Sequence, residues 1–190
     1  KSGYKPGSPC VLIGKALTIQ QTKILEETKI FFKNFYEKCP EFKLIVRPHP
    51  SEKIQYWFDL CKKYKNIDVV FDDQSTCSWI AASEMLISTN CTTAIEAFFL
   101  KKKSVNFLPY KDETVEYLLP KETSIVVRNT DDLIKIIKNH DNEDFFVLDE
   151  KKKLKIKEWL FNAFEGCAVN DTINILNDQV EKFNSSENIA

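Results

Sequence analysis

The chain has 190 residues, of which 43% are hydrophobic and 12% aromatic; this is enough for one sizeable core and excludes a disordered protein. Its formal net charge is −1, from 27 Lys and Arg against 28 Asp and Glu, so no basic field predicts nucleic-acid binding. Six irregularly spaced cysteines without a C-x-x-C pair favour reduced thiols over disulfides or a zinc site.

Short apolar runs alternate with amphipathic segments along the first three quarters of the chain. The runs are apolar at successive positions and rich in Val, Ile and Leu, which is typical of strands buried on both faces of a parallel sheet. The predicted strands are 10–14 (CVLIG), 42–47 (FKLIVR), 67–71 (IDVVF), 84–88 (EMLIS), 104–109 (SVNFLP) and 123–127 (TSIVV).

Four amphipathic segments between or after these runs predict helices, at 19–38, 52–64, 92–101 and 129–139, the last opened by the capping sequence NTDD. Strand–helix alternation predicts right-handed crossovers and a Rossmann-like, doubly wound α/β sheet of about six parallel strands. We expect a linker over 1–9, this domain over 10–149, two closing helices over 150–183 and a frayed tail over 184–190.

The first candidate site is LIVRPHPSE (44–52), where a predicted strand stops. Ligands of open α/β sheets bind at the carboxyl ends of strands, so Arg47 and His49 are expected at that edge. Pro48 and Pro50 stiffen the turn, and an imidazole beside a guanidinium suits phosphate oxygens, while Ser51 is expected to cap the next helix. The alternative is a surface turn in which His49 bonds to a backbone carbonyl.

The second candidate site is STNCTTAIE (88–96), at the end of the next strand but one. The hydroxyl and amide groups gather where a helix start favours an anion, at Ser88, Thr89, Asn90, Thr92 and Thr93. Glu96 lies one turn further on, where its carboxylate would accept hydrogen bonds from ribose or sugar hydroxyls. The alternative is an ordinary capped helix. The glycines stand at 3, 7, 14 and 166, so neither a dinucleotide fingerprint nor a P-loop is present.

Other polar residues are interpreted as structural. Arg128 is expected to support the helix cap at 129, Asp72 to form part of a turn, and Trp79 to lie in the core. Asp112 and Glu113, which follow the strand at 104–109, are weaker candidates for contact with a sugar. No paired carboxylates or histidine cluster predicts a metal site.

Taken together, RPHPSE and CSWIAASEMLISTNCTTAIEAFFLKKKSVNFLP closely resemble the C-terminal half of bacterial surface carbohydrate biosynthesis proteins, which look like two-domain GT-B glycosyltransferases. The resemblance covers about 40–137 and also FEGCAVNDTINIL (164–176). In the wider group, which includes bacterial sialyltransferases and Kdo transferases, an HP motif and a Ser/Thr-rich motif bind the phosphate of a CMP-sugar. The resemblance places HP on His49–Pro50 and the second motif on Ser88, Thr89, Thr92 and Thr93.

The same resemblance implies that Glu96 meets ribose or sugar hydroxyls. Two features depart from the family. Its members usually have Gly-Lys-Pro after the second motif's helix, whereas this chain has Lys101–Lys103. In addition, 190 residues cannot hold both halves of such an enzyme, so the acceptor domain is expected from a longer protein or a partner chain.

These observations predict the donor-binding half of a glycosyltransferase for surface polysaccharide or lipopolysaccharide synthesis. The expected substrate is a nucleotide-sugar, CMP-linked by the resemblance, and the expected acceptor is a glycan or a lipid-linked glycan, with no cofactor. Arg47, His49 and the 88–93 turn would neutralise the leaving phosphate, and a protonated His49 would act as general acid.

Two alternatives remain open. One is a sugar-nucleotide epimerase or glycerophosphotransferase on a related fold, and the other is a non-catalytic scaffold of the same fold. We expect no signal peptide and no transmembrane segment, since no apolar run reaches about 18 residues. The expected location is the cytoplasm, including the inner face of the membrane.

Overall fold

The computed structural model describes residues 9–141 and 150–160, and the chain divides into two compact units, 1–147 and 148–190. The boundary expected from the sequence was 149/150. The first unit contains α1 (Pro9–Lys38), β1 (Leu44–Val46), α2 (Ile54–Cys61), β2 (Ile67–Val69), α3 (Thr76–Ala82), β3 (Met85–Ser88), α4 (Thr93–Phe99), β4 (Lys103–Phe107), α5 (Leu118–Glu122), β5 (Ile125–Val127) and α6 (Thr130–Lys138).

The second unit contributes one described helix, α7 (Glu150–Trp159), which falls within the first of the two predicted closing helices. The predicted linker over 1–9 overlaps α1 at Pro9, and its other residues, the rest of the predicted closing helices and the tail lie outside the described residues. In the part of the chain that is described, no helix combines the length and the apolar character needed to cross a bilayer.

All the strands are parallel, and they form two small sheets. Leu44 of β1 lies opposite Ile67 of β2. The other sheet has the order β3-β4-β5, with Ser88 opposite Asn106 and Phe107 opposite Val127. This mixed α/β arrangement is compatible with a Rossmann-like fold, with the carboxyl ends of β3, β4 and β5 at one edge.

The predicted sheet of six strands is wrong, because the described residues contain five strands in two sheets and the run 10–14 lies in α1. A short apolar run is compatible with a buried helix as well as with a buried strand, and here it continues without a turn into the amphipathic segment 19–38. The other five predicted strands each contain an observed strand, although β4 begins one residue before the predicted range.

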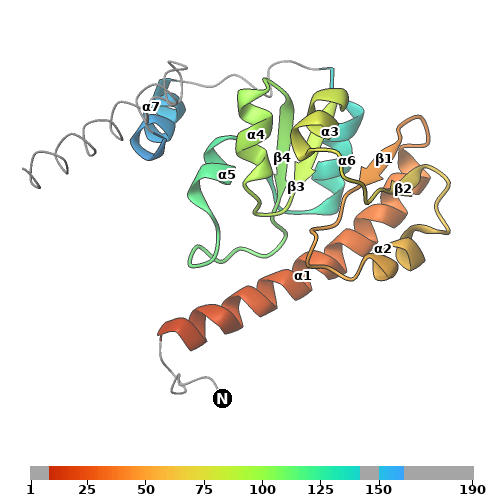
Figure 1. Ribbon diagram of the computed structural model, residues 1–190, viewed down its shortest axis with the longest axis horizontal. Coiled ribbons are helices and arrows are strands. Elements are labelled where there is room, and N and C mark those ends of the chain that lie inside the picture. The colour runs from red at the N-terminus through yellow and green to blue at the C-terminus, as the bar shows by residue number, and fades with distance from the viewer. Residues whose placement is uncertain (1–8, 142–149, 161–190) are drawn as a thin grey trace, which may run out of the picture. The chain divides into compact units, whose positions relative to one another are not determined.

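The core of the first unit lies between the C-terminal half of α1, α6 and the strands. Its buried members come from these elements, and include Phe31, Phe32, Phe35, Val105, Phe107, Val127, Leu133 and Ile137. The N-terminal half of α1 extends past this core toward the loop between β4 and α5 (Figure 1). As predicted, Asn129 caps α6, where its side-chain oxygen accepts a hydrogen bond of 2.9 Å from the Asp132 N–H.

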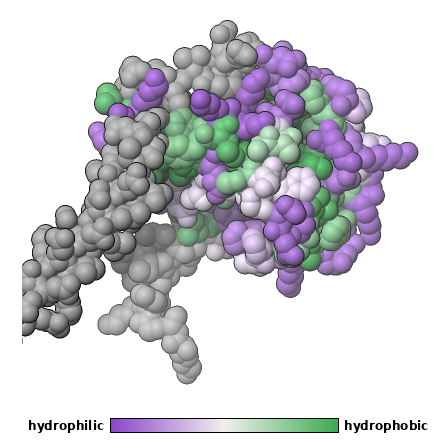
Figure 2. All heavy atoms as spheres, turned by 45° about the horizontal axis from the view of Figure 1, so that its top comes forward, coloured by the Kyte–Doolittle hydropathy of each residue, from purple (hydrophilic) through white to green (hydrophobic). Residues whose placement is uncertain are grey.

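Two short helices, α3 and α5, were not predicted. The start of α3 could have been recognised in the sequence, because serine is a common N-cap residue. Ser75 is the N-cap, and its Oγ accepts a 3.2 Å hydrogen bond from the Ser78 N–H. Exposed apolar side chains occur on several elements, singly as at Ile19 and Ile30 or in adjacent pairs as at Phe99 and Leu100. Figure 2 shows green apolar areas interrupted by purple hydrophilic side chains on the face that it presents, which is normal for a protein surface.

The turn after α4 explains how the chain manages without the glycine expected there. Lys101 has φ 54°, in the left-handed region. Its N–H donates to the Phe98 carbonyl at 3.0 Å, and the Lys102 N–H donates to the Ala97 carbonyl at 2.9 Å. These are the two hydrogen bonds of a Schellman motif, whose left-handed position glycine usually occupies. Lysine therefore adopts the glycine conformation at a steric cost.

We expect Lys101→Gly to stabilise the protein by about 0.5–1 kcal/mol, because glycine adopts the left-handed conformation without steric strain. Part of this gain is lost, since glycine also makes the unfolded chain more flexible. The free energy of unfolding from urea denaturation measures the effect. Lys102→Gly, one residue on, is the control; it also removes the hydrogen bond from Lys102 Nζ to the Ser83 carbonyl, so it should destabilise the protein. Equal effects of the two substitutions would contradict the assignment of strain to residue 101.

Candidate functional site

Arg47 follows β1 at the carboxyl edge, where the sequence placed it. Its Nη2 donates hydrogen bonds to Asp72 Oδ1 at 3.1 Å and to the Gln74 carbonyl at 3.0 Å. The guanidinium carbon lies 5.6 Å from the centre of the Trp79 ring, within range of a cation–π interaction. Its Nη1 is buried and has no hydrogen-bond partner in the described part of the chain. Arg47 is therefore held in place with one donor nitrogen unused.

Asp72 is the group that orients Arg47. The same Oδ1 also accepts hydrogen bonds from Trp79 Nε1 at 3.2 Å and from the Gln74 N–H at 3.2 Å. The bond to the Gln74 N–H is the predicted turn, but the ion pair and the contact with Trp79 were not predicted. About a third of the Asp72 side chain is exposed, so solvent weakens the ion pair. The main effect of the ion pair is to fix the position of the two side chains, because three donors bond to one carboxylate oxygen of Asp72.

His49 belongs to a local turn and is exposed. Its Nδ1 lies 2.7 Å from Ser51 Oγ and accepts a 3.2 Å hydrogen bond from the Ser51 N–H, which assigns the proton of the neutral ring to Nε2. The His49 N–H donates to Glu52 Oε2 at 2.7 Å. The expectation that Ser51 caps α2 is wrong, because the N-cap is Lys53 and no side chain caps that helix. Ser51 instead orients the His49 ring.

The second motif forms the turn from β3 into α4. Thr89 is half-buried, Thr92 is exposed at the N-cap position without a side-chain capping bond, and Thr93 begins the helix. Ser88 lies deeper, with 6% of its surface exposed. Thr89, Thr92 and Thr93 of this turn are therefore at least partly exposed, whereas the Ser88 hydroxyl is buried.

Glu96 is half-buried on α4, and its Oε2 accepts a hydrogen bond from the Cys77 thiol at 3.5 Å. Desolvation, followed by this hydrogen bond and the negative charge of Glu96, raises the pKa of Cys77, so the thiol stays protonated at neutral pH. Cys77 is part of α3, as is Trp79. The segment 72–79 therefore contacts Arg47 through one set of residues and Glu96 through another, and it links the two predicted motifs.

Asn90 connects the turn to other parts of the chain. It has φ 53°, and its Nδ2 donates to the Val115 carbonyl at 2.7 Å and to Gln20 Oε1 at 3.4 Å. Its Oδ1 accepts a hydrogen bond of 2.7 Å from the Tyr117 N–H, and its own N–H donates to Asn106 Oδ1 at 2.8 Å. Since these bonds occupy the Asn90 amide, its side chain serves the fold, in contrast to the predicted contact with phosphate.

The loop between β4 and α5 is held by an ion pair whose carboxylate is buried. Both oxygens of Glu116 accept hydrogen bonds from Arg128, at 2.5 and 3.0 Å, and Lys121 lies 3.1 Å away. Arg128 also donates to the Leu108 carbonyl at 3.1 Å, so its interpretation as a structural residue agrees with its contacts. Asp112, half-buried, accepts hydrogen bonds within the loop from the Thr114 N–H and hydroxyl.

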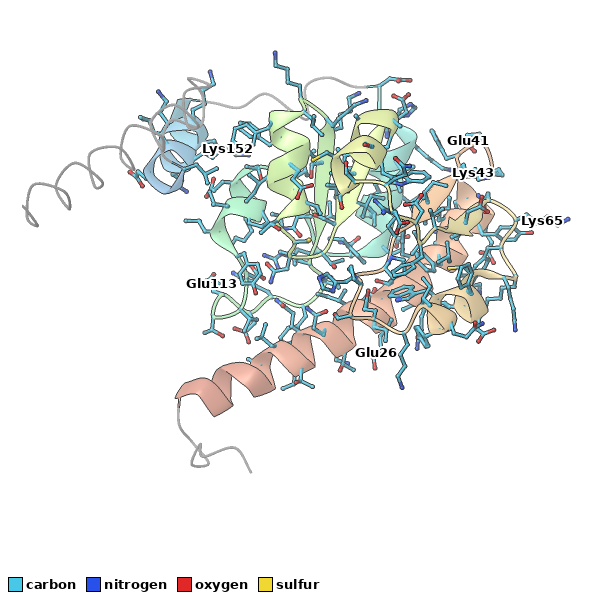
Figure 3. The ribbon with its side chains drawn as sticks, viewed as in Figure 1. Glu26, Glu41, Lys43, Lys65, Glu113 and Lys152 are labelled. Atoms are coloured by element: carbon cyan, nitrogen blue, oxygen red, sulfur yellow. The ribbon has the colours of Figure 1, made fainter. Side chains whose placement is uncertain are left out.

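Glu113 is exposed near the bend of the same loop, on the side of the sheet along which α1 passes (Figure 3). The ion pair changes the acidity of Glu116. The hydrogen bond from Arg128 lowers the pKa of Glu116 from 4.5 to about 2, against the opposing effect of burial.

Four residues of this edge were missed by the sequence analysis: Gln20, Cys77, Asn106 and Glu116. Asn106 had a recognisable signal, because it is an amide in the middle of an apolar strand and a buried amide needs partners. Within the described residues, no three His, Cys, Asp or Glu side chains are grouped so that they could hold a metal ion. Comparisons with protein-family models, curated proteins and solved structures give no match.

The Glu116–Arg128 pair predicts a specific acid sensitivity. Because the pKa of Glu116 is lower in the folded protein, the pair stabilises the fold above pH 4.5, and this stabilisation is lost as the pH falls from about 4.5 toward about 2. We expect wild type to be more stable than Glu116→Gln at pH 7. The difference should shrink by about 2 kcal/mol between pH 5 and pH 3.

Urea denaturation at a series of pH values measures this difference. Glu113→Gln changes an exposed glutamate of the same loop and is the matched control, for which we expect a difference below about 0.5 kcal/mol throughout. A difference for Glu116→Gln that does not vary with pH would contradict the argument.

Proposed function

We propose that this chain binds a nucleotide-sugar through its phosphate and forms the donor-binding half of a glycosyltransferase for surface polysaccharide or lipopolysaccharide. The observation that carries the proposal is the unused, buried Nη1 of Arg47, on a guanidinium held by Asp72 and Trp79. A guanidinium nitrogen in this position gains most from a charged oxygen, and phosphate supplies one.

The partly exposed threonines of the β3–α4 turn complete the proposed phosphate contacts. Thr89, Thr92 and Thr93 would donate to phosphate oxygens, while Ser88 and the Asn90 side chain are left out because they face the interior. Glu96 would accept hydrogen bonds from ribose or sugar hydroxyls in place of the weak Cys77 contact. The shared neighbour of Arg47 and Glu96, the segment 72–79, supports placing both in one site.

The proposed reaction is transfer of the sugar from a nucleotide, CMP-linked by the sequence resemblance, without an obligate metal. Negative charge grows on the leaving phosphate as the glycosidic bond breaks, and Arg47 stabilises it. His49 would deliver a proton to that phosphate from Nε2 when the ring is protonated, a state in which Nδ1 no longer accepts the hydrogen bond from the Ser51 N–H. The acceptor would be a glycan or lipid-linked glycan, bound by a second domain.

We expect CMP to bind with saturation in a calorimetric titration, and Arg47→Ala to weaken it about 10- to 100-fold, the value of one or two hydrogen bonds to a charged group. His49→Ala should also weaken binding. Lys65→Ala removes a positive charge from the connection before β2, at the amino end of that strand, and should leave binding unchanged (Figure 3).

UDP, GDP and AMP are titrated in parallel. Preference for UDP would move the proposal to a UDP-sugar donor or to the epimerase alternative. An equal loss of affinity in Arg47→Ala and Lys65→Ala would indicate a nonspecific charge effect and contradict the site. Absence of binding by all four nucleotides at millimolar concentration would contradict the proposed function and favour a non-catalytic scaffold.

A further inference from the structure

A second group of polar side chains lies inside the carboxyl edge, apart from Arg47 and the threonines. Gln20 of α1 and Asn106 of β4 have no exposed surface, and Ser88 of β3 and Asn90 each have 6%. Three atoms of this group have no hydrogen-bond partner among the described residues: Gln20 Nε2, Asn106 Nδ2 and Ser88 Oγ. Leaving a buried polar group unpaired is costly, so three of them around one residue require an explanation.

The hydrogen bonds that are made fix the orientation of each amide. The Tyr117 N–H needs an acceptor, so the Asn90 side chain is oriented with its Oδ1 toward Tyr117 and its NH₂ group toward Gln20. Gln20 must then present its oxygen and turn its own NH₂ away. In the same way the Asn90 N–H requires the oxygen of Asn106, which leaves the Asn106 NH₂ free. Rotating either amide would break an existing bond.

The unpaired groups belong to neighbouring positions. Ser88 and Asn106 lie opposite each other in the parallel pair β3–β4, so their side chains leave the same face of the sheet. Gln20 and Asn106 both bond to Asn90, which is two residues beyond Ser88. Two amide donors and one hydroxyl, which can accept, thus belong to residues that bond to Asn90 or stand two positions before it, where α1 meets the sheet.

The chemistry of these groups favours a neutral ligand. Among the described residues, no hydrogen bond of Gln20, Ser88, Asn90 or Asn106 involves a charged side chain. Glu116, between the two residues that bond to Asn90, is the charged residue of this loop, and its carboxylate is already paired with Arg128 and Lys121. A water molecule can accept two hydrogen bonds and donate a third, which matches the usual number for buried water, about three.

We propose that Gln20, Ser88 and Asn106 enclose one internal water molecule. It accepts hydrogen bonds from Gln20 Nε2 and Asn106 Nδ2 and donates one to Ser88 Oγ. The water joins α1, β3 and β4, and completes the network that Asn90 begins. This binding site is independent of the nucleotide proposal, because its groups face away from the surface.

The test uses the full chain, labelled with ¹⁵N, with the side-chain NH₂ signals assigned by through-bond correlations. In water-selected NOE and ROE spectra, the NH₂ groups of Gln20 and Asn106 should show cross-peaks to water whose signs indicate a bound molecule that tumbles with the protein. The exposed Gln55 of α2 is the internal control and should show the opposite NOE sign, typical of short-lived surface water.

Ser88→Ala removes the water's acceptor without breaking a hydrogen bond between described residues, and we expect it to weaken both cross-peaks. Adding inorganic phosphate to wild type should leave both NH₂ signals in place. Absence of water cross-peaks at Gln20 and Asn106 would overturn the proposal in favour of a dry site. Saturable phosphate shifts of these two signals would overturn it in favour of an anion site.

Discussion

The carboxyl edge of the three-stranded sheet depends on the hydrogen bonds of Asn90. Asn90 has a left-handed backbone conformation, and its main-chain N–H donates to Asn106 on β4. The Asn90 side chain donates to the loop before α5 and to Gln20 of α1. Asparagine tolerates this conformation better than most residues and has both a donor and an acceptor to offer. A single residue therefore sets where the β3–α4 turn, the loop after β4 and α1 stand relative to one another.

The two arginines of the chain follow strands of different sheets, Arg47 after β1 and Arg128 after β5, and they act in different ways. Arg128 uses both arms on the buried Glu116 and one of them also on a carbonyl, so its donors serve the fold. Arg47 uses only Nη2, on a partly exposed aspartate and a carbonyl, and keeps Nη1 free of any partner among the described residues. An ion pair with two hydrogen bonds to a buried carboxylate is costly to break, whereas a single contact to a partly exposed carboxylate is worth little in stability. Of the two arginines, Arg47 therefore has the guanidinium nitrogen without a partner among the described residues, which is why we propose it as the ligand contact.

The sequence predicted the local features and missed those that depend on tertiary contacts. Runs of Val, Ile and Leu located β1 to β5, and the NTDD sequence located the start of α6, because burial and capping leave a local pattern. The run at 10–14 failed because its length and composition suit a helix equally well. Arg47 could be placed at the edge by counting along β1. Its partners could not, since the contact with Asp72 joins residues 25 positions apart.

The contact between Arg47 and Asp72 also bears on how an anion would bind. The carboxylate offsets part of the guanidinium charge, so long-range attraction of an anion is weakened and salt screens what remains. In return, Asp72 and Trp79 hold the guanidinium in one orientation, and a ligand would not have to order a flexible side chain, a cost of about 0.5–1.5 kcal/mol. Affinity at Nη1 would then come from directed hydrogen bonds more than from net charge. Such a site selects for the position of an oxygen atom, as expected for a phosphate presented by a larger nucleotide and less so for a free ion.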